Sequence, residues 1–224
     1  MSEYFNPKET PITFILVLAN IITFVVLEII GDTTDAVFML VKGALNPQMV
    51  LQYGQWYRLF TCTFMHFGIE HLMNNMLLLF LLGQIFERAV GPVRYLGIYL
   101  GSGFAGSFLS FFIMCLMNKN DIVAGASGAI FGIVGGMIVV IIVNKGRYNG
   151  ISAKRMILMA VLTLYFGFIS SKTDNVGHIS GLVTGMILTF FSYGISTLMK
   201  GAHIDFKGEK TYTLSNNQDE EGLK

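Results

Sequence analysis

The chain has 224 residues, of which 53% are hydrophobic and only 13% are charged, and its formal net charge is +1. A soluble domain carries about 25% charged residues, so the composition is typical of a membrane protein. The small net charge argues against nucleic acid as a partner. Two cysteines do not form a disulfide framework; we expect Cys62 and Cys115 to be free thiols, with a bridge between them as the alternative.

Six segments with few charges approach the length that a membrane-spanning helix needs, about 20 residues. They are residues 11–30, 69–86, 95–117, 122–143, 153–171 and 176–199. The first resembles a signal peptide, but its length and the lack of a clear small-x-small cleavage site favour a retained helix. The sequence therefore predicts an all-α, polytopic domain of six transmembrane helices.

This membrane domain is expected over residues 11–200, between polar cytoplasmic tails at 1–10 and 201–224. Its longest connection, residues 31–68, contains Gln55-Trp56-Tyr57-Arg58. Such a mixture of aromatic and polar residues is typical of an element in the membrane interface. An ordinary outer loop with an aromatic anchor is the alternative.

The distribution of Lys and Arg predicts the orientation of the six helices. With the N-terminus inside, eleven of the fifteen Lys and Arg residues fall on the inner side and four on the outer side. The positive-inside rule then places both termini in the cytoplasm. The second, fourth and sixth segments consequently begin at the outer face.

The second segment opens with His71-Leu72-Met73-Asn74-Asn75. His71 and Asn75 are four residues apart and share one face of a helix. Both side chains offer N–H donors, which acyl transfer requires to stabilise a developing oxyanion. A polar helix start that contacts headgroups or loop backbone is the alternative interpretation.

The fourth segment contains Gly125-Ala126-Ser127-Gly128, and Gly128, Gly132 and Gly136 recur every four residues along one face. Such a stripe lets another helix backbone come close. The small neighbours of Ser127 would admit a substrate backbone to a nucleophilic hydroxyl. The alternative is a helix start with small packing residues.

The sixth segment carries His178 with Gly181 and Gly185 on the same face. We expect the two glycine stripes to pack together and bring His178 to Ser127 as its base. No acidic third member is evident, since Asp174 falls in the preceding loop and Glu70 on another face, so the pattern predicts a dyad. A satisfied interfacial histidine is the alternative.

These motifs resemble the rhomboid family of intramembrane serine proteases, specifically the compact bacterial six-helix type. The resemblance covers most of residues 55–185. Its elements are Trp56-Tyr57-Arg58, Phe64-Met65-His66-Phe67-Gly68 leading to His71-x-x-x-Asn75, Gly83-x-x-x-Glu87-x-x-x-Gly91, Gly125-x-Ser127-Gly128 and His178 with Gly181-x-x-x-Gly185.

The resemblance implies an endopeptidase that cuts single-pass or polytopic membrane proteins in or near their transmembrane segments. It implies a Ser127–His178 dyad, oxyanion donors from His71, Asn75 and the Ser127 backbone N–H, and Phe131 packed on the His178 ring. The implied location is the bacterial cytoplasmic membrane, with the lipid bilayer as surroundings and the site opening to the outer face. It implies no cofactor and no metal.

A catalytically silent relative that binds client proteins without cutting them is the nearest alternative. Such relatives usually lack the serine or the histidine, whereas this chain retains both. A transporter or channel would predict charges deep in several spans or paired broken helices, and neither pattern is present. The substrate, the gating element and the oligomeric state are not readable from the sequence.

Overall fold

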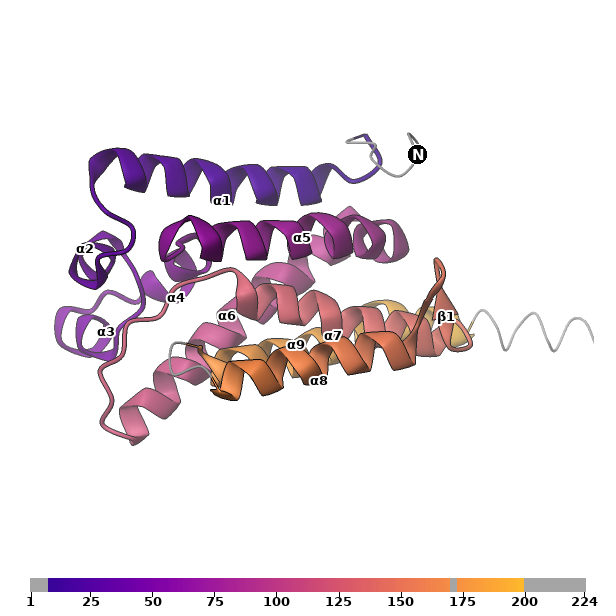
Figure 1. The fold of residues 1–224 in the computed structure, drawn as a ribbon. Helices are drawn as coiled ribbons and strands as arrows, with labels where there is room; N and C mark the ends of the chain where they lie inside the picture. The colour runs from indigo at the N-terminus through magenta and orange to yellow at the C-terminus, as the bar shows by residue number, and fades with distance from the viewer. Residues whose placement is uncertain (1–7, 170–172, 200–224) are drawn as a thin grey trace, which may run out of the picture.

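Helices build almost the whole of the computed structural model, which describes residues 8–169 and 173–199 (Figure 1). The long helices are α1 (Pro11–Ile30), α5 (Gly68–Val90), α6 (Pro92–Leu116), α7 (Ser127–Val143), α8 (Ala153–Ile169) and α9 (Asn175–Thr189). The strands β1 (Arg147–Tyr148) and β2 (Ile151–Ser152) form one antiparallel hairpin between α7 and α8. The predicted all-α class is confirmed.

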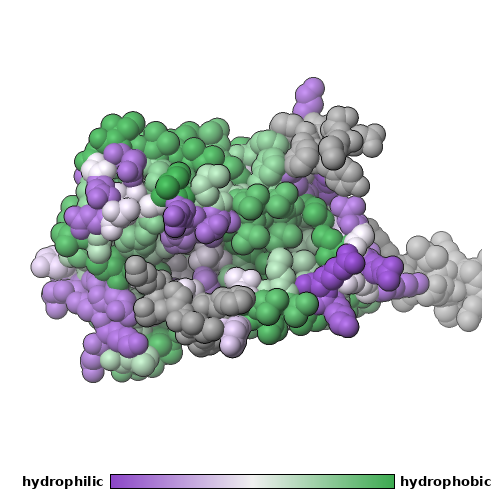
Figure 2. Space-filling model, in the orientation of Figure 1, coloured by the Kyte–Doolittle hydropathy of each residue, from purple (hydrophilic) through white to green (hydrophobic). Residues whose placement is uncertain are grey.

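Among the described residues, four helices are long and apolar enough to cross a membrane, and α7 is a shorter apolar helix. The four are α1, α5, α6 and the helix over Asn175–Met199, in which α9 continues through a π-helical turn, η3 (Phe190–Gly194). On the face that Figure 2 shows, hydrophobic side chains cover much of the middle, and many hydrophilic ones gather towards the two ends. Six spans thus stay a prediction.

The prediction that the fourth helix begins at residue 122 was wrong. Residues 122–126 are not helical, and α7 begins at Ser127. Val123 exchanges two backbone hydrogen bonds with Leu45, at 2.8 and 2.9 Å, which holds the segment in an extended form. Gly125 has φ of +141°, a conformation that L side chains rarely adopt, so the chain turns there before the helix starts.

The predicted end of the fifth helix and both predicted tails fall largely outside the described residues. The structure follows α8 to Ile169, and residues 170–172 are not described. Of the tails, only residues 8–10 are described.

The long connection is itself folded, into α2 (Ala36–Lys42), α3 (Pro47–Tyr53), α4 (Arg58–Thr61) and the short 3-10 helix η2 (Cys62–Phe64). Arg58 holds these pieces together and is only 2% exposed. Its guanidinium donates to the carbonyls of Leu40 and Ala44, both at 2.6 Å, and to the Gln55 side chain at 2.7 Å. Three acceptors satisfy the buried charge, as burial of an ion requires, and so fix the shape of the connection.

The helix α7 lies at the centre of the bundle and is buried along nearly its whole length. It packs most closely against α9 and α6, while α1 lies on the far side of α5 (Figure 1). Small residues make this packing possible: a β-carbon on Gly132 would overlap Ser102 of α6, and one on Gly136 would overlap Phe86 of α5.

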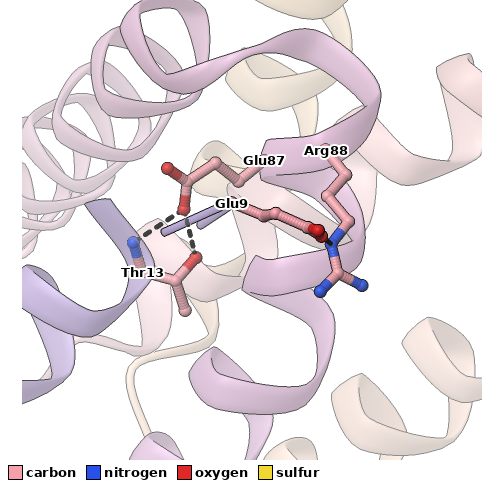
Figure 3. A network of polar contacts seen from close by, with 4 residues as sticks. All are labelled: Glu9, Thr13, Glu87 and Arg88. Atoms are coloured by element: carbon pink, nitrogen blue, oxygen red, sulfur yellow. Dashed lines mark hydrogen bonds and ion pairs between the residues drawn. The ribbon is translucent and has the colours of Figure 1, made fainter. Parts of the chain in front are cut away.

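A buried carboxylate joins α1 to α5. Glu87 is 1% exposed and accepts hydrogen bonds from Ile12 N at 2.9 Å, Thr13 N at 2.8 Å and Thr13 Oγ1 at 2.7 Å. Beside it, Arg88 pairs with Glu9 at 3.2 Å (Figure 3). The carboxylate sits at the N-terminus of α1, where backbone N–H groups lack partners within the helix and the helix dipole favours negative charge.

We expect Glu87→Ala to destabilise the protein, because three donors at the start of α1, two of them buried, lose their acceptor. At about 1 kcal/mol or more for each hydrogen bond, the free energy of unfolding falls by about 3 kcal/mol. The midpoint of thermal unfolding in detergent measures the effect. The matched control is Glu70→Ala, since Glu70 lies on the same helix and is exposed; equal midpoints for the two variants would contradict the structural role of Glu87.

Candidate active site

Ser127 is the first residue of α7, and the segment before it is tied to the folded connection. Gly125 N donates to the Cys62 carbonyl at 2.9 Å, and Ala126 N donates to Nε2 of His66 at 3.4 Å. These two hydrogen bonds hold the residues just before the start of the helix. The backbone N–H of Ser127 belongs to the first turn, where such groups have no partner within the helix.

His178 lies opposite Ser127 on the first turn of α9. Its Nε2 is 2.8 Å from Ser127 Oγ, a hydrogen-bond distance. The Phe131 ring, one turn after Ser127, stacks on the imidazole with centroids 4.4 Å apart and an angle of 18° between the planes. The structure thus brings together the three residues that the sequence placed on the two facing helices.

Contact between the backbones of α7 and α9 sets this distance. A β-carbon on Gly181 would overlap the Gly128 carbonyl oxygen, and one on Gly185 would overlap the Gly132 carbonyl. The expectation that the two glycine stripes pack against each other is confirmed. Because Ser127 and His178 precede the first contact on each helix, close approach of the backbones brings their side chains within bonding distance.

No acidic side chain supports the imidazole among the residues that the structure describes. Nδ1 of His178 is buried and has no hydrogen-bond partner there. Asp174 caps α9 instead, by accepting from Gly177 N at 2.9 Å, and Glu70 is exposed. Among the described residues, Ser127 and His178 therefore contact each other without an acidic side chain at the imidazole.

Two donors lie one helical turn apart on α5, and the first of them, on His71, is beside Gly125 and Ser127. Asn75 is 5% exposed, and its Nδ2 has no hydrogen-bond partner within the described parts of the chain. His71 Nδ1 accepts from Phe67 N at 3.4 Å, which leaves Nε2 as the N–H donor of a neutral ring. A β-carbon on Gly125 would lie 2.9 Å from His71 Nε2 and 3.7 Å from Ser127 Oγ, so the imidazole and the hydroxyl flank this glycine.

His66 and Cys62, for which the sequence predicts no role in the site, both contact the segment before Ser127. Burial and the adjacent His71 ring, which lies edge-on at 5.1 Å, lower the pKa of His66 to about 3. Burial raises the pKa of Cys62 to about 11, and both cysteines are free. At neutral pH both groups are uncharged, and their contacts hold residues 125 and 126 in place.

One glycine of α6 lies next to the site. A β-carbon on Gly106 would lie 2.9 Å from the Gly177 carbonyl oxygen, next to His178. Ser110, one turn later on α6, donates to Asp174 at 2.6 Å. The spacing of four between Gly106 and Ser110, together with an Asp three residues before Gly177, is the signal that sequence analysis could have used.

Within the described ranges, no group of three or more His, Cys, Asp or Glu side chains is placed to hold a metal ion.

Comparison with known proteins gives consistent matches. The family model of the rhomboid domain matches residues 53–194. Rhomboid protease GluP of Bacillus subtilis (strain 168) is 37% identical over 180 residues, which is 80% of this chain and 34% of GluP. RHOMBOID-like proteins 4 and 1 of Arabidopsis thaliana are 37% and 36% identical over 150 and 149 residues, each match covering 66% of this chain and 37% of the relative. The chain thus spans about a third of the length of these relatives.

Gly181→Ala should separate α7 from α9, because the added methyl group overlaps the Gly128 carbonyl. Overpacking of this kind costs about 1–3 kcal/mol, and we expect a lower midpoint of thermal unfolding in detergent. Gly97→Ala is the matched control, since a β-carbon on this helical glycine meets nothing within 4 Å. Equal stability of the two variants would contradict the proposed backbone contact.

Proposed function

This chain belongs to the rhomboid family, and we propose that it is a serine-type endopeptidase that cuts membrane proteins within the bilayer. The observation that carries the proposal is the 2.8 Å contact between Ser127 Oγ and His178 Nε2. A serine hydroxyl is a weak nucleophile until a base takes its proton. Polar groups at membrane depth are costly and are mostly functional.

In the proposed mechanism, His178 has its ring proton on Nδ1, so that Nε2 accepts the hydroxyl proton as Ser127 Oγ attacks the scissile carbonyl carbon. The C–N bond then breaks, and His178 returns the proton to the leaving amine. An ester between Ser127 and the acyl part of the substrate remains. Water attacks this ester with His178 again as the base, which releases the new carboxyl end and restores the serine.

The tetrahedral intermediates place negative charge on the former carbonyl oxygen. We assign its stabilisation to Asn75 Nδ2, His71 Nε2 and the backbone N–H of Ser127. Support comes from the lack of a described partner for Asn75 Nδ2 and from the position of His71 beside Gly125. Donors that are already in place cost no reorganisation when the charge develops. Gly125 and Gly128 would leave room for the substrate backbone.

The proposal includes six spans. The helices α7 and α8 have 17 residues each, about 26 Å at 1.5 Å per residue, which is close to the hydrocarbon thickness of about 30 Å. Both termini are then cytoplasmic by the distribution of Lys and Arg. The dyad would open to the outer face, where the α7 and α9 helices begin, and the substrates would be membrane proteins.

Ser127→Ala and His178→Ala should each abolish proteolysis and labelling by a fluorophosphonate probe, while thermal unfolding stays close to that of the wild type. Ser180→Ala is the matched control, because Ser180 is a buried serine on α9 whose hydroxyl donates to the Val176 carbonyl at 2.6 Å. Labelling that persists in purified Ser127→Ala overturns the assignment of Ser127 as the nucleophile. A well-folded wild type that takes no probe and cuts no substrate favours the client-binding alternative.

Asn75→Ala should lower kcat about a hundredfold, with little change in KM, because its donor acts mainly in the transition state. Steady-state kinetics with a model transmembrane substrate separates the two constants. Asn74→Ala is the control, since Asn74 is the adjacent residue of α5 and is exposed. An increase in KM alone, at unchanged kcat, would assign Asn75 to substrate binding instead.

A further inference from the structure

The first turn of α9, which carries His178, is fastened to α6 by one carboxylate. Both oxygens of Asp174 lie 2.6 Å from the Ser110 hydroxyl. One of them also accepts from Gly177 N at 2.9 Å, and the Asp174 backbone carbonyl accepts from His178 N at 3.1 Å. Asp174 therefore contacts α6 through its side chain and the histidine through its main chain.

The turn is shaped around this carboxylate. A β-carbon on Gly177 would overlap Asp174 and lie 3.1 Å from Ser110 Oγ, and one on Gly106 would lie 2.9 Å from the Gly177 carbonyl. Glycine at these two positions lets α6 approach the turn and lets the hydroxyl reach the carboxylate. The contact is part-buried: Ser110 is only 3% exposed, and Asp174 is of intermediate exposure.

We propose that the Ser110–Asp174 pair is the positioning element that holds His178 in register with Ser127. The inference rests on the proposed function and adds two residues to it. In a triad, a third side chain bonds to the imidazole and orients it. Here Nδ1 has no such partner among the described residues. The carboxylate orients the backbone turn from which the ring projects, and Phe131 fixes the plane of the ring.

The pair acts through hydrogen bonding, not through negative charge. Burial raises the pKa of Asp174 above its usual range, although the bonds from Ser110 and Gly177 oppose the shift. A raised pKa means that the folded state disfavours the ionised form, so the charge does not stabilise the fold at neutral pH. Asparagine retains an acceptor for Gly177 N and Ser110 Oγ and is an equally good helix N-cap.

The test compares Asp174→Ala, Asp174→Asn, Ser110→Ala and Ser110→Thr by the kinetics of fluorophosphonate labelling. We expect Asp174→Ala and Ser110→Ala to lower the maximal labelling rate about tenfold or more, because small displacements of a catalytic group are costly. The probe concentration at half-maximal rate should not change. Asp174→Asn and Ser110→Thr should label within about threefold of the wild type, because each retains its hydrogen bond.

Asp35→Ala is the matched control, because Asp35 caps α2 in the same way, by accepting from Val37 N at 2.8 Å, and is exposed. Wild-type labelling rates in both Asp174→Ala and Ser110→Ala overturn the proposal. The proposal is also overturned if Asp174→Asn labels as slowly as Asp174→Ala, since the negative charge would then be essential. If the labelling rate falls in Asp174→Ala but not in Ser110→Ala, the role assigned to α6 is overturned.

Hydrogen exchange of a peptide covering residues 173–180 separates this inference from the proposed function. If wild-type Ser127 takes no probe, the proposed function fails, yet the pair still predicts faster exchange of the Gly177 and His178 amides in Asp174→Ala and Ser110→Ala. Unchanged exchange in both variants overturns the pair itself. If Asp174→Ala unfolds, hydrogen exchange in Ser110→Ala still tests the proposal, because this variant leaves the Asp174 cap of α9 intact.

Discussion

Close contact between the backbones of α7 and α9 is the constraint on which the rest of the structure depends. The contact exists only because Gly181 and Gly185 carry no side chain where they meet the carbonyls of Gly128 and Gly132. In lipid, helices gain no hydrophobic driving force from association, so close packing and hydrogen bonds must supply the attraction. The same contact defines the distance between Ser127 and His178, which are the residues that precede it on each helix. Stability of the bundle and geometry of the dyad therefore have one cause.

Some buried polar groups hold the scaffold together, and others have no hydrogen-bond partner among the described residues. Arg58 and Glu87 each make three hydrogen bonds to backbone or to neighbouring side chains, as buried charges must. Asn75 Nδ2 makes none to the described residues. Several other buried atoms in the described ranges also lack partners, including Gln84 Oε1 and Ser102 Oγ. An unpaired donor alone therefore does not mark a site, and the role proposed for Asn75 depends on its place one turn after His71 on the same face of α5.

Periodicity predicted what depends on single helices and their facing surfaces. The spacing of four in Gly128 and Gly132, and in Gly181 and Gly185, fixed which faces of α7 and α9 meet. The same spacing put His71 and Asn75 on one face of α5. The extended run before Ser127 was missed, because its conformation comes from backbone bonds between Val123 and the distant Leu45, which no local pattern encodes. The role of Glu87 at the N-terminus of α1 likewise depends on a partner 74 residues away.

The helix α6 contributes no residue to the dyad, but its contacts explain how the site stays assembled. Three elements meet at the dyad end of the bundle: the connection that holds residues 125 and 126, the start of α7, and the first turn of α9. The helix α6 contacts both flanks, since Ser107 Oγ lies 3.2 Å from Cys62 Sγ and Ser110 Oγ lies 2.6 Å from Asp174. Cys62 in turn accepts from Gly125 N through its carbonyl. Two serines one turn apart thus link the loop before the nucleophile to the turn that carries the base. Glycine contact sets how close α7 and α9 lie, and α6 sets where the first residues of each helix lie along that contact.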